Sequence, residues 1–343
     1  MSHELEIKDG QARMFFAGEE PWHKLGTKVE TEQTAAQAIK LAKLNWISHL
    51  EPIYIKGSKM IDNIPIVGTQ IKNKQAVVRD DGEILGVVGP NYNIIQNVEL
   101  FDFLDDVIGS GQAVYHTAGS LFNGSRIFIT VKLTGDMKVG QDVLDKYLLL
   151  VAGHDGKLAV HVKFTPIRVV CNNTASVALG TWMKEDKVVR INSTYSFKHT
   201  NSYKQRAAEA REALNLSQYY YKHMEEEFNK MLDQQFSDTN MEQFTEELFP
   251  VGIDENGGKK KLTTRLKNNR EKIQILFHNG KGQNNVANTR WAAYNAVTEF
   301  IDHHRSTLVR TGKNENEVRF DSIFYGSGKN IRQKAYDLLA IKS

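Results

Sequence analysis

Residues 125–180 read SRIFITVKLTGDMKVGQDVLDKYLLLVAGHDGKLAVHVKFTPIRVVCNNTASVALG, and this stretch decides the fold. Alternating and β-branched residues over 126–133 predict a strand, and the apolar run 147–152 predicts a second one. A turn at 154–157 leads into a third strand over 158–169, which Pro166 is expected to bend or end because proline has no N–H to donate. Asn172, Asn173 and Thr174 can cap a helix over 175–183. Three antiparallel strands followed by a helix predict an α+β protein with a β-β-β-α unit.

The flanking segments extend this pattern. On the N-terminal side we expect a helix over 34–43, β-rich pieces over 52–88 with a hairpin turn at Asp81-Gly82, and a helix over 97–108. Beyond residue 200 the periodicity is helical, with helices expected over 203–235, 241–249, 263–277, around 291–308 and over 330–340. The first of these would bury a stripe formed by Leu214, Tyr221, Met224, Phe228 and Met231. We therefore predict an α+β core domain with an antiparallel sheet over residues 1–200, and a mostly helical C-terminal domain over 201–343.

The composition is that of a soluble globular chain, with 41% hydrophobic and 25% charged residues. The single cysteine, Cys171, excludes an intramolecular disulfide framework and a cysteine-cluster zinc site, and it fits a reducing compartment. No stretch approaches about 18 apolar residues without a charge. The acidic N-terminal residues also lack the layout of a signal peptide. We expect a cytoplasmic protein that has no membrane partner.

No enzyme motif stands out. The glycine-rich stretch 326–329 lacks the spacing of a P-loop and is better explained as the start of a helix. His303 and His304 are adjacent, so on a helix their side chains diverge and do not readily share a metal. Cys171 lies at a predicted strand-to-helix junction, where a helix N-terminus favours a thiolate, but the sequence pairs it with no histidine. We expect no enzymatic activity, no metal and no cofactor, and we keep a Cys171 nucleophile as a minor alternative.

Charge is distributed unevenly although the net charge is only +3. Residues 157–211 contain 10 basic and 3 acidic residues, residues 212–256 contain 2 and 11, and residues 257–281 contain 8 and 1. In the first basic block, cations alternate with aromatic residues. This combination suits a single nucleic-acid strand, because cations pair with phosphates while bases stack on rings. The candidate nucleic-acid-binding residues are Lys157, Lys163, Arg168, Lys184, Lys187, Arg190, Tyr195, Phe197, Lys198, Lys204 and Arg206.

These assignments have alternatives. The aromatic residues of the first block can belong to the core, and the cations of both blocks can be solvated faces that only promote solubility. Lys157 and Lys163 are separated by an even number of residues, so an unbroken strand would place them on one face. The acidic run 225–227 is a candidate contact for the basic block of a neighbouring subunit, which would favour assembly.

Four stretches together resemble one family. They are PWHKLGT at 21–27, FTPIRVVCNNT at 164–174, WAAYNAVTEFIDH at 291–303 and FYGSG at 324–328 with the residues up to Leu338. The chain resembles the phage- and plasmid-encoded proteins built around domain of unknown function 932. It departs slightly from that family at Ala175-Ser176, where a leucine is expected. The resemblance implies a mobile-element origin and expression in a bacterial host, and it supplies no active site.

A more remote likeness is to the single-strand annealing recombinases of the RecT, Redβ and Erf class. The predicted β-β-β-α unit, the basic blocks, the missing nucleotide motif and the phage setting are similar to theirs. The leading hypothesis is therefore an ATP-independent protein that binds and anneals single-stranded DNA in homologous recombination, as a homo-oligomeric ring or filament. The alternative is a phage protein-interaction or anti-defence factor that binds no nucleic acid.

Overall fold

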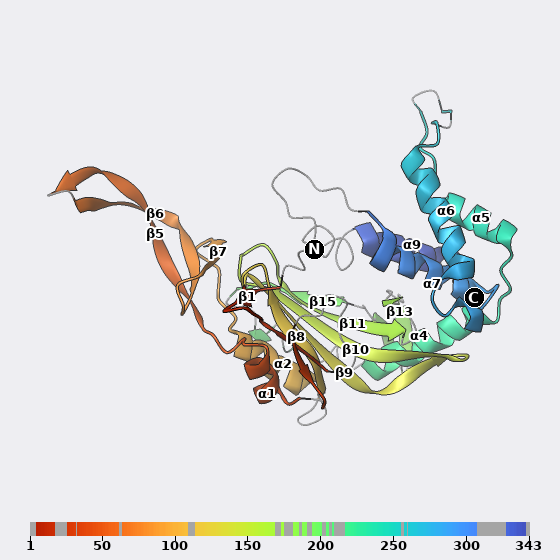
Figure 1. The fold of residues 1–343 in the computed structure, drawn as a ribbon, viewed down its shortest axis with the longest axis horizontal. Coiled ribbons are helices and arrows are strands. Elements are labelled where there is room, and N and C mark those ends of the chain that lie inside the picture. The colour runs from red at the N-terminus through yellow and green to blue at the C-terminus, as the bar shows by residue number, and fades with distance from the viewer. Residues whose placement is uncertain are drawn as a thin grey trace. The chain divides into compact units, whose positions relative to one another are not determined.

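The computed structural model describes residues 5–17, 26–31, 33–61, 64–108, 114–168, 173–174, 181–184, 187–190, 194–200, 204–205, 208, 217–254, 257–258, 260–306 and 327–340. The chain forms two compact units that interleave in sequence. Unit 1 comprises residues 1–134, 147–164 and 194–216, and unit 2 comprises residues 135–146, 165–193 and 217–343. The long strands and the C-terminal helices of the α+β fold are drawn in Figure 1.

The largest sheet has eight strands in the order β12-β11-β10-β9-β8-β3-β4, and β15 also pairs with β11. Its bounds are β3 (Met14–Ala17), β4 (Thr27–Val29), β8 (Val114–Leu121), β9 (Arg126–Val139), β10 (Asp142–Gly153), β11 (Val160–Arg168), β12 (Asn173–Thr174) and β15 (Thr194–Phe197). Strands β8 and β9 pair antiparallel, as do β11 and β15, whereas β3 and β4 are parallel. The predicted α+β fold class is confirmed, with three long strands where residues 126–169 predicted them.

Alternation along β9 explains how this sheet buries one of its faces. Ile127, Ile129 and Val131 are fully buried, while the residues between them are half-buried, as the two-residue period of a strand requires. In β10, by contrast, residues 147–153 are all buried. A strand covered on both faces loses alternation and becomes a continuous apolar run.

Pro166 does not end its strand, and the helix predicted after it is wrong. Pro166 lies inside β11, because β15 pairs with residues 160–163 and β12 pairs with residues 167–168, so the proline falls between the two paired segments. The helix predicted over 175–183 is contradicted at its end by a hairpin of β13 (Thr181–Lys184) and β14 (Lys187–Arg190), whereas residues 175–180 lie outside the described residues. Asn173 and Thr174 form β12 rather than a helix cap.

Unit 1 also contains the predicted helices and hairpins of the N-terminal half. A capping box at Thr34 and Gln37 begins α1, because each supplies a hydrogen bond to the backbone of the other. The hairpin predicted at Asp81-Gly82 joins β6 to β7. The bounds are α1 (Ala35–Leu41), α2 (Asn97–Ile108), β1 (Ile7–Lys8), β2 (Gln11–Ala12), β5 (Ser48–Ile61), β6 (Ile64–Arg79) and β7 (Ile84–Val88).

Unit 2 packs helices around Trp291, which is fully buried and donates from Nε1 to Asp142 Oδ2 at 2.9 Å. Tyr221, Met224, Phe228 and Met231 form the buried stripe predicted for the first helix, whereas Leu214 lies outside the described residues. The bounds are α4 (Ser217–Leu232), α5 (Asp238–Leu248), α6 (Thr264–Asn279), the 3-10 helix η1 (Gln283–Asn285), α7 (Arg290–Glu299), the π-helix η2 (Phe300–His304) and α9 (Ser327–Leu339).

Two carboxylates of the acidic run 225–227 are engaged inside unit 2. Glu225 accepts a hydrogen bond from the backbone N–H of Lys138 at 3.0 Å, and Glu227 pairs with Lys230 at 2.7 Å. Part of the run that we considered for assembly thus has an internal role. In the described part of the chain, no helix combines the length and the apolar character needed to cross a bilayer.

Candidate functional site

The candidate nucleic-acid-binding residues are divided between the two units. Seven fall in unit 1, namely Lys157, Lys163, Tyr195, Phe197, Lys198, Lys204 and Arg206, and unit 2 has Arg168, Lys184, Lys187 and Arg190. For the four candidates in unit 2 the structure describes the backbone only. The register of the β13–β14 hairpin pairs Lys184 with Lys187. Arg206 lies outside the described residues, as does Cys171.

Two predicted contacts in unit 1 need correction. Lys163 is only 3% exposed and lies in the run 162–166 of β11, which is buried on both faces. Phe197 is also 3% exposed and packs edge-on against Phe103, with ring centroids 5.5 Å apart. Both side chains belong to the core, whereas Tyr195 is half-buried with its ring 6.4 Å from that of Phe164. Lys157 precedes β11, so the two lysines do not share one unbroken strand.

The exposed candidates Lys157 and Lys198 line one cavity of about 510 Å³. Three loop segments of unit 1 form its walls, namely residues 89–92 after β7, 156–159 before β11 and 198–200 after β15. The antiparallel register explains this convergence. Val160 at the start of β11 pairs with Phe197 at the end of β15, so the residues just outside both strands emerge at the same end of the sheet. Lys204, the third exposed candidate, follows six residues later, outside the cavity lining.

Glycines let β7 approach the turn that carries Lys157. A Cβ atom on Gly86 would lie 2.5 Å from the Cα of Asp155, closer than real side chains come. Gly156 has φ +73°, a conformation that L-residues rarely adopt, and a Cβ there would lie 2.7 Å from Val88. Asp155 Oδ1 accepts the backbone N–H of Lys157 at 2.9 Å and closes the turn. The Lys157 backbone is therefore held firmly, while its side chain stays exposed.

A stacked pair of rings borders the cavity. The Tyr92 and His199 rings have centroids 4.9 Å apart and planes inclined by 10°. The Tyr92 hydroxyl donates to the carbonyl of Gly153 at 3.2 Å, and the backbone N–H of Asn93 donates to the carbonyl of His199 at 3.0 Å. The sequence analysis missed this pair. Its only sequence signal was the position of His199 directly after the candidate cation Lys198.

Buried histidines behind the cavity are held in their neutral form. His154 is fully buried, lies 2.9 Å through Nε2 from the Asn97 side-chain oxygen and packs edge-on against Trp46. Burial, and then the charge of His199, lowers the pKa of His154 to about 3. Burial lowers the pKa of His199 to about 4, although the backbone of Asn93 and the charge of Asp155 act in the opposite direction. At neutral pH the positive charge on the cavity wall therefore comes from the lysines.

We expect the protein to lose stability in mild acid because of His154 and His199. Histidines of an unfolded chain take up protons near pH 6.5, so between about pH 7 and pH 4 the unfolded state binds more protons and is favoured by acidification. We expect the free energy of unfolding in urea to fall by on the order of 3 kcal/mol for each of the two histidines between these two pH values. The His199→Phe variant keeps a ring for Tyr92 to stack on but cannot titrate. Over the same pH range, the free energy of unfolding of this variant should fall less than that of the unaltered protein. An equal fall in the two proteins would contradict the assignment to His199.

The cavity is suited to an anion with an attached apolar or aromatic part. Lys157 and Lys198 are both exposed and line the cavity, where an ammonium group can pair with a ligand anion. Asp155 is the nearby buried carboxylate, and its Oδ2 lies 3.9 Å from Arg126 Nε, which offsets its charge. The described residues contain no cluster of ligands that could hold a metal ion.

Fold and cavity together define an α+β protein with a cationic, aromatic-edged cavity at one end of a mixed sheet, which is antiparallel at β11–β15 and parallel at β3–β4. Residues 84–324 match the family model described as "Domain of unknown function (DUF932)", so the chain belongs to this family, as the resemblance predicted. The match begins at β7 and includes all three segments that line the cavity. Comparison with curated proteins gave no match, and comparison with solved structures gave none either.

Proposed function

We propose that this protein binds single-stranded DNA, and that the Lys157–Lys198 cavity grips phosphates of the strand. The observation that carries the proposal is the convergence of two exposed cations from separate loops beside the Tyr92–His199 stack. A single strand needs a cationic surface for its phosphates and rings for its unpaired bases, and it tolerates any base sequence at such a site. The exposed Lys204, six residues beyond Lys198, would continue the phosphate contacts.

The annealing activity and the oligomer are further parts of the proposal. They rest on the likeness to single-strand annealing recombinases and on a sequence without a P-loop. A protein without ATP chemistry can still promote annealing if several subunits hold one strand extended and leave its bases exposed. On this proposal the protein is encoded by a phage or plasmid and acts in the cytoplasm of the bacterial host during homologous recombination.

The direct test is a titration of a fluorescently labelled 40-nucleotide single strand, followed by anisotropy in about 50 to 200 mM salt. We expect binding at 100 mM salt, with a logarithmic affinity that falls linearly as the logarithm of the salt concentration rises, because phosphate contacts release counterions. Annealing of two complementary strands should accelerate without ATP, and cross-linking should reveal oligomers. No detectable binding at 100 mM salt would refute the proposed function.

One observation favours the alternative of a protein-interaction factor. The sheet β5-β6-β7 exposes apolar side chains, among them Ile84 at 65% and Ile55 at 59% of their surface. Large apolar side chains exposed on a sheet are candidates for contacts with another protein. This alternative predicts a protein partner that remains bound after nuclease treatment and that is lost when Ile55 and Ile84 are changed to Ser.

A further inference from the structure

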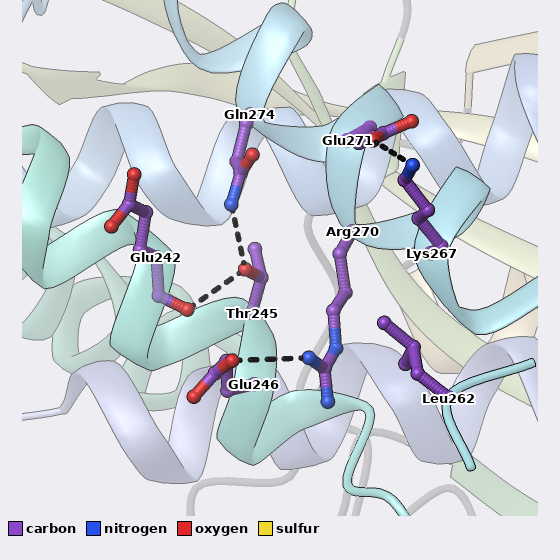
Figure 2. Close-up of a pocket in the computed structure, with 8 residues that line it drawn as sticks. All are labelled: Glu242, Thr245, Glu246, Leu262, Lys267, Arg270, Glu271 and Gln274. Carbon is purple, nitrogen blue, oxygen red and sulfur yellow. Dashed lines mark hydrogen bonds and ion pairs between the residues drawn. The ribbon is translucent and has the colours of Figure 1, made fainter.

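The second basic block, residues 257–281, has different electrostatic surroundings on its two sides. Figure 2 shows the side of α6 that faces α5, where a small cavity of about 220 Å³ is lined by charged and polar residues. Arg270 Nη1 lies 3.2 Å from Glu246 Oε1, and Lys267 Nζ lies 3.7 Å from Glu271 Oε1. Arg270 also donates to the carbonyl of Phe249. Arg270 thus joins α6 to α5, a packing role that goes beyond the solubility alternative, and the exposed Lys267 pairs with Glu271 within α6.

The other side of α6 faces a larger hollow of about 420 Å³ against the π-helix η2. Its polar lining residues are Asn268, Asn269, Lys272, His304, Ser306 and the acidic Glu271, which also lines the smaller cavity. Ile275, which is 52% exposed, and Phe300 supply an apolar part of the wall. A π-helix interrupts regular helical packing and is frequently found at functional sites, because it changes the direction of the side chains that follow.

Lys272 supplies the positive charge in the lining of this hollow. Burial, and next the charge of Lys272, lowers the pKa of His304, so the imidazole is neutral at neutral pH and can donate a hydrogen bond. The carboxylates of this region have partners of their own, since Glu271 lies 3.7 Å from Lys267 and Glu299 accepts the backbone N–H of Lys281 at 3.1 Å, with His304 at 3.8 Å. Lys272 therefore remains the cation that would attract an anion to the hollow.

We propose that the hollow formed by Lys272, Asn268, Asn269 and His304 binds one nucleotide unit of a single strand through its phosphate. The cation and the amide groups are suitable donors for phosphate oxygens, and Ile275 beside them offers an apolar contact for a sugar or base. A bare inorganic anion would use the donors but not the apolar wall. This inference rests on the proposed function, to which it adds a contact in unit 2, separate from the cavity of unit 1.

The experiment compares Lys272→Glu with Lys267→Glu, which makes the same charge change on the same helix but on the neutralised side shown in Figure 2. Each variant is titrated with the labelled single strand at several salt concentrations. Lys272→Glu should lower the affinity about fivefold at 100 mM salt and reduce the salt slope by about 0.7, the value for one lost phosphate contact. Lys267→Glu should change the affinity less than about twofold. Equal effects of the two variants, with the unaltered protein still binding, would overturn this inference and leave the proposed function standing.

A second measurement distinguishes the binding of a strand from the binding of a free nucleotide. It reports on the hollow directly and not through the overall affinity of the protein. The imidazole proton resonances of His304 are followed by NMR during addition of the single strand or of thymidine 5′-monophosphate. We expect the strand to shift them in the unaltered protein but not in Lys272→Glu. A shift with the mononucleotide alone would overturn strand binding at this hollow in favour of a free nucleotide. No shift with either ligand, while the oligonucleotide still binds in the anisotropy assay, would overturn the inference alone, and failure of both assays would overturn the proposed function as well.

Discussion

Reversing both cavity charges in the variant Lys157→Glu/Lys198→Glu should weaken single-stranded DNA binding at least about 25-fold at 100 mM salt. Each phosphate contact on a single strand contributes a salt slope of about 0.7, which corresponds to about fivefold in affinity at this salt concentration. Two lost contacts therefore account for about 25-fold, and repulsion between the new carboxylates and the phosphates adds to it. The salt slope should fall by about 1.4, which distinguishes lost phosphate contacts from a misfolded protein.

The matched control is Lys28→Glu/Lys40→Glu, which changes the net charge of unit 1 equally at two exposed lysines on β4 and α1 that do not line the cavity. We expect this variant to lose only about two- to threefold in affinity, through the long-range field of the protein. If the control and the cavity variant lose equal affinity, binding reflects overall charge and the cavity has no special role. An unchanged affinity in the cavity variant would remove Lys157 and Lys198 from the interface.

Replacing Arg79 by Met should lower the free energy of unfolding of unit 1 by about 3–5 kcal/mol, the usual cost of removing one partner of a buried ion pair. Arg79 is 2% exposed and donates from Nη1 to Glu6 Oε1 at 2.8 Å, and from Nε and Nη2 to Asp81 at 2.7 and 2.8 Å. Glu6 is also buried and accepts the Ser120 hydroxyl at 2.6 Å. Without Arg79 the buried Glu6 carboxylate would keep Arg13, whose Nε lies 3.2 Å from Oε1, but would lose its closer and more deeply buried cation.

Urea unfolding at pH 7 measures this effect, and Lys8→Met is the control. Lys8 also pairs with Asp81, but its side chain is 41% exposed, so its removal should cost less than about 1 kcal/mol. The hydrogen bonds from Arg79, and secondarily from Lys8, hold the pKa of Asp81 far below its usual range. The contribution of this carboxylate to stability is therefore present above its unfolded pKa near 3.9 and is lost only in stronger acid. A cost below 1 kcal/mol for Arg79→Met would show that the network is not important for stability.

Local features of the sequence were sufficient for many elements of the fold. The alternation over 126–133, the turn residues Asp81-Gly82 and the polar residue Thr34 before an apolar helix each act within a few neighbours. The elements they predicted are present as β9, the β6–β7 turn and α1. Residues 181–184 behaved differently, because a four-residue segment with both helix- and strand-forming residues takes the conformation of its pairing partner, here β14. The strand continues past Pro166 because β11 pairs with β15 before the proline and with β12 after it.

For the candidate site, the amino-acid order alone established that residues 157–211 concentrate cations and aromatic rings. It contained no information on which of them face solvent, since that depends on pairing between distant strands. The antiparallel register of β11 with β15 brings Lys157 and Lys198, which lie just beyond the paired segment, to one cavity. Lys163 and Phe197, inside the same paired segment, are buried by packing against the faces of the sheet. Charge is a property of each residue, whereas exposure and convergence arise only when hydrogen-bonded strands align remote parts of the chain.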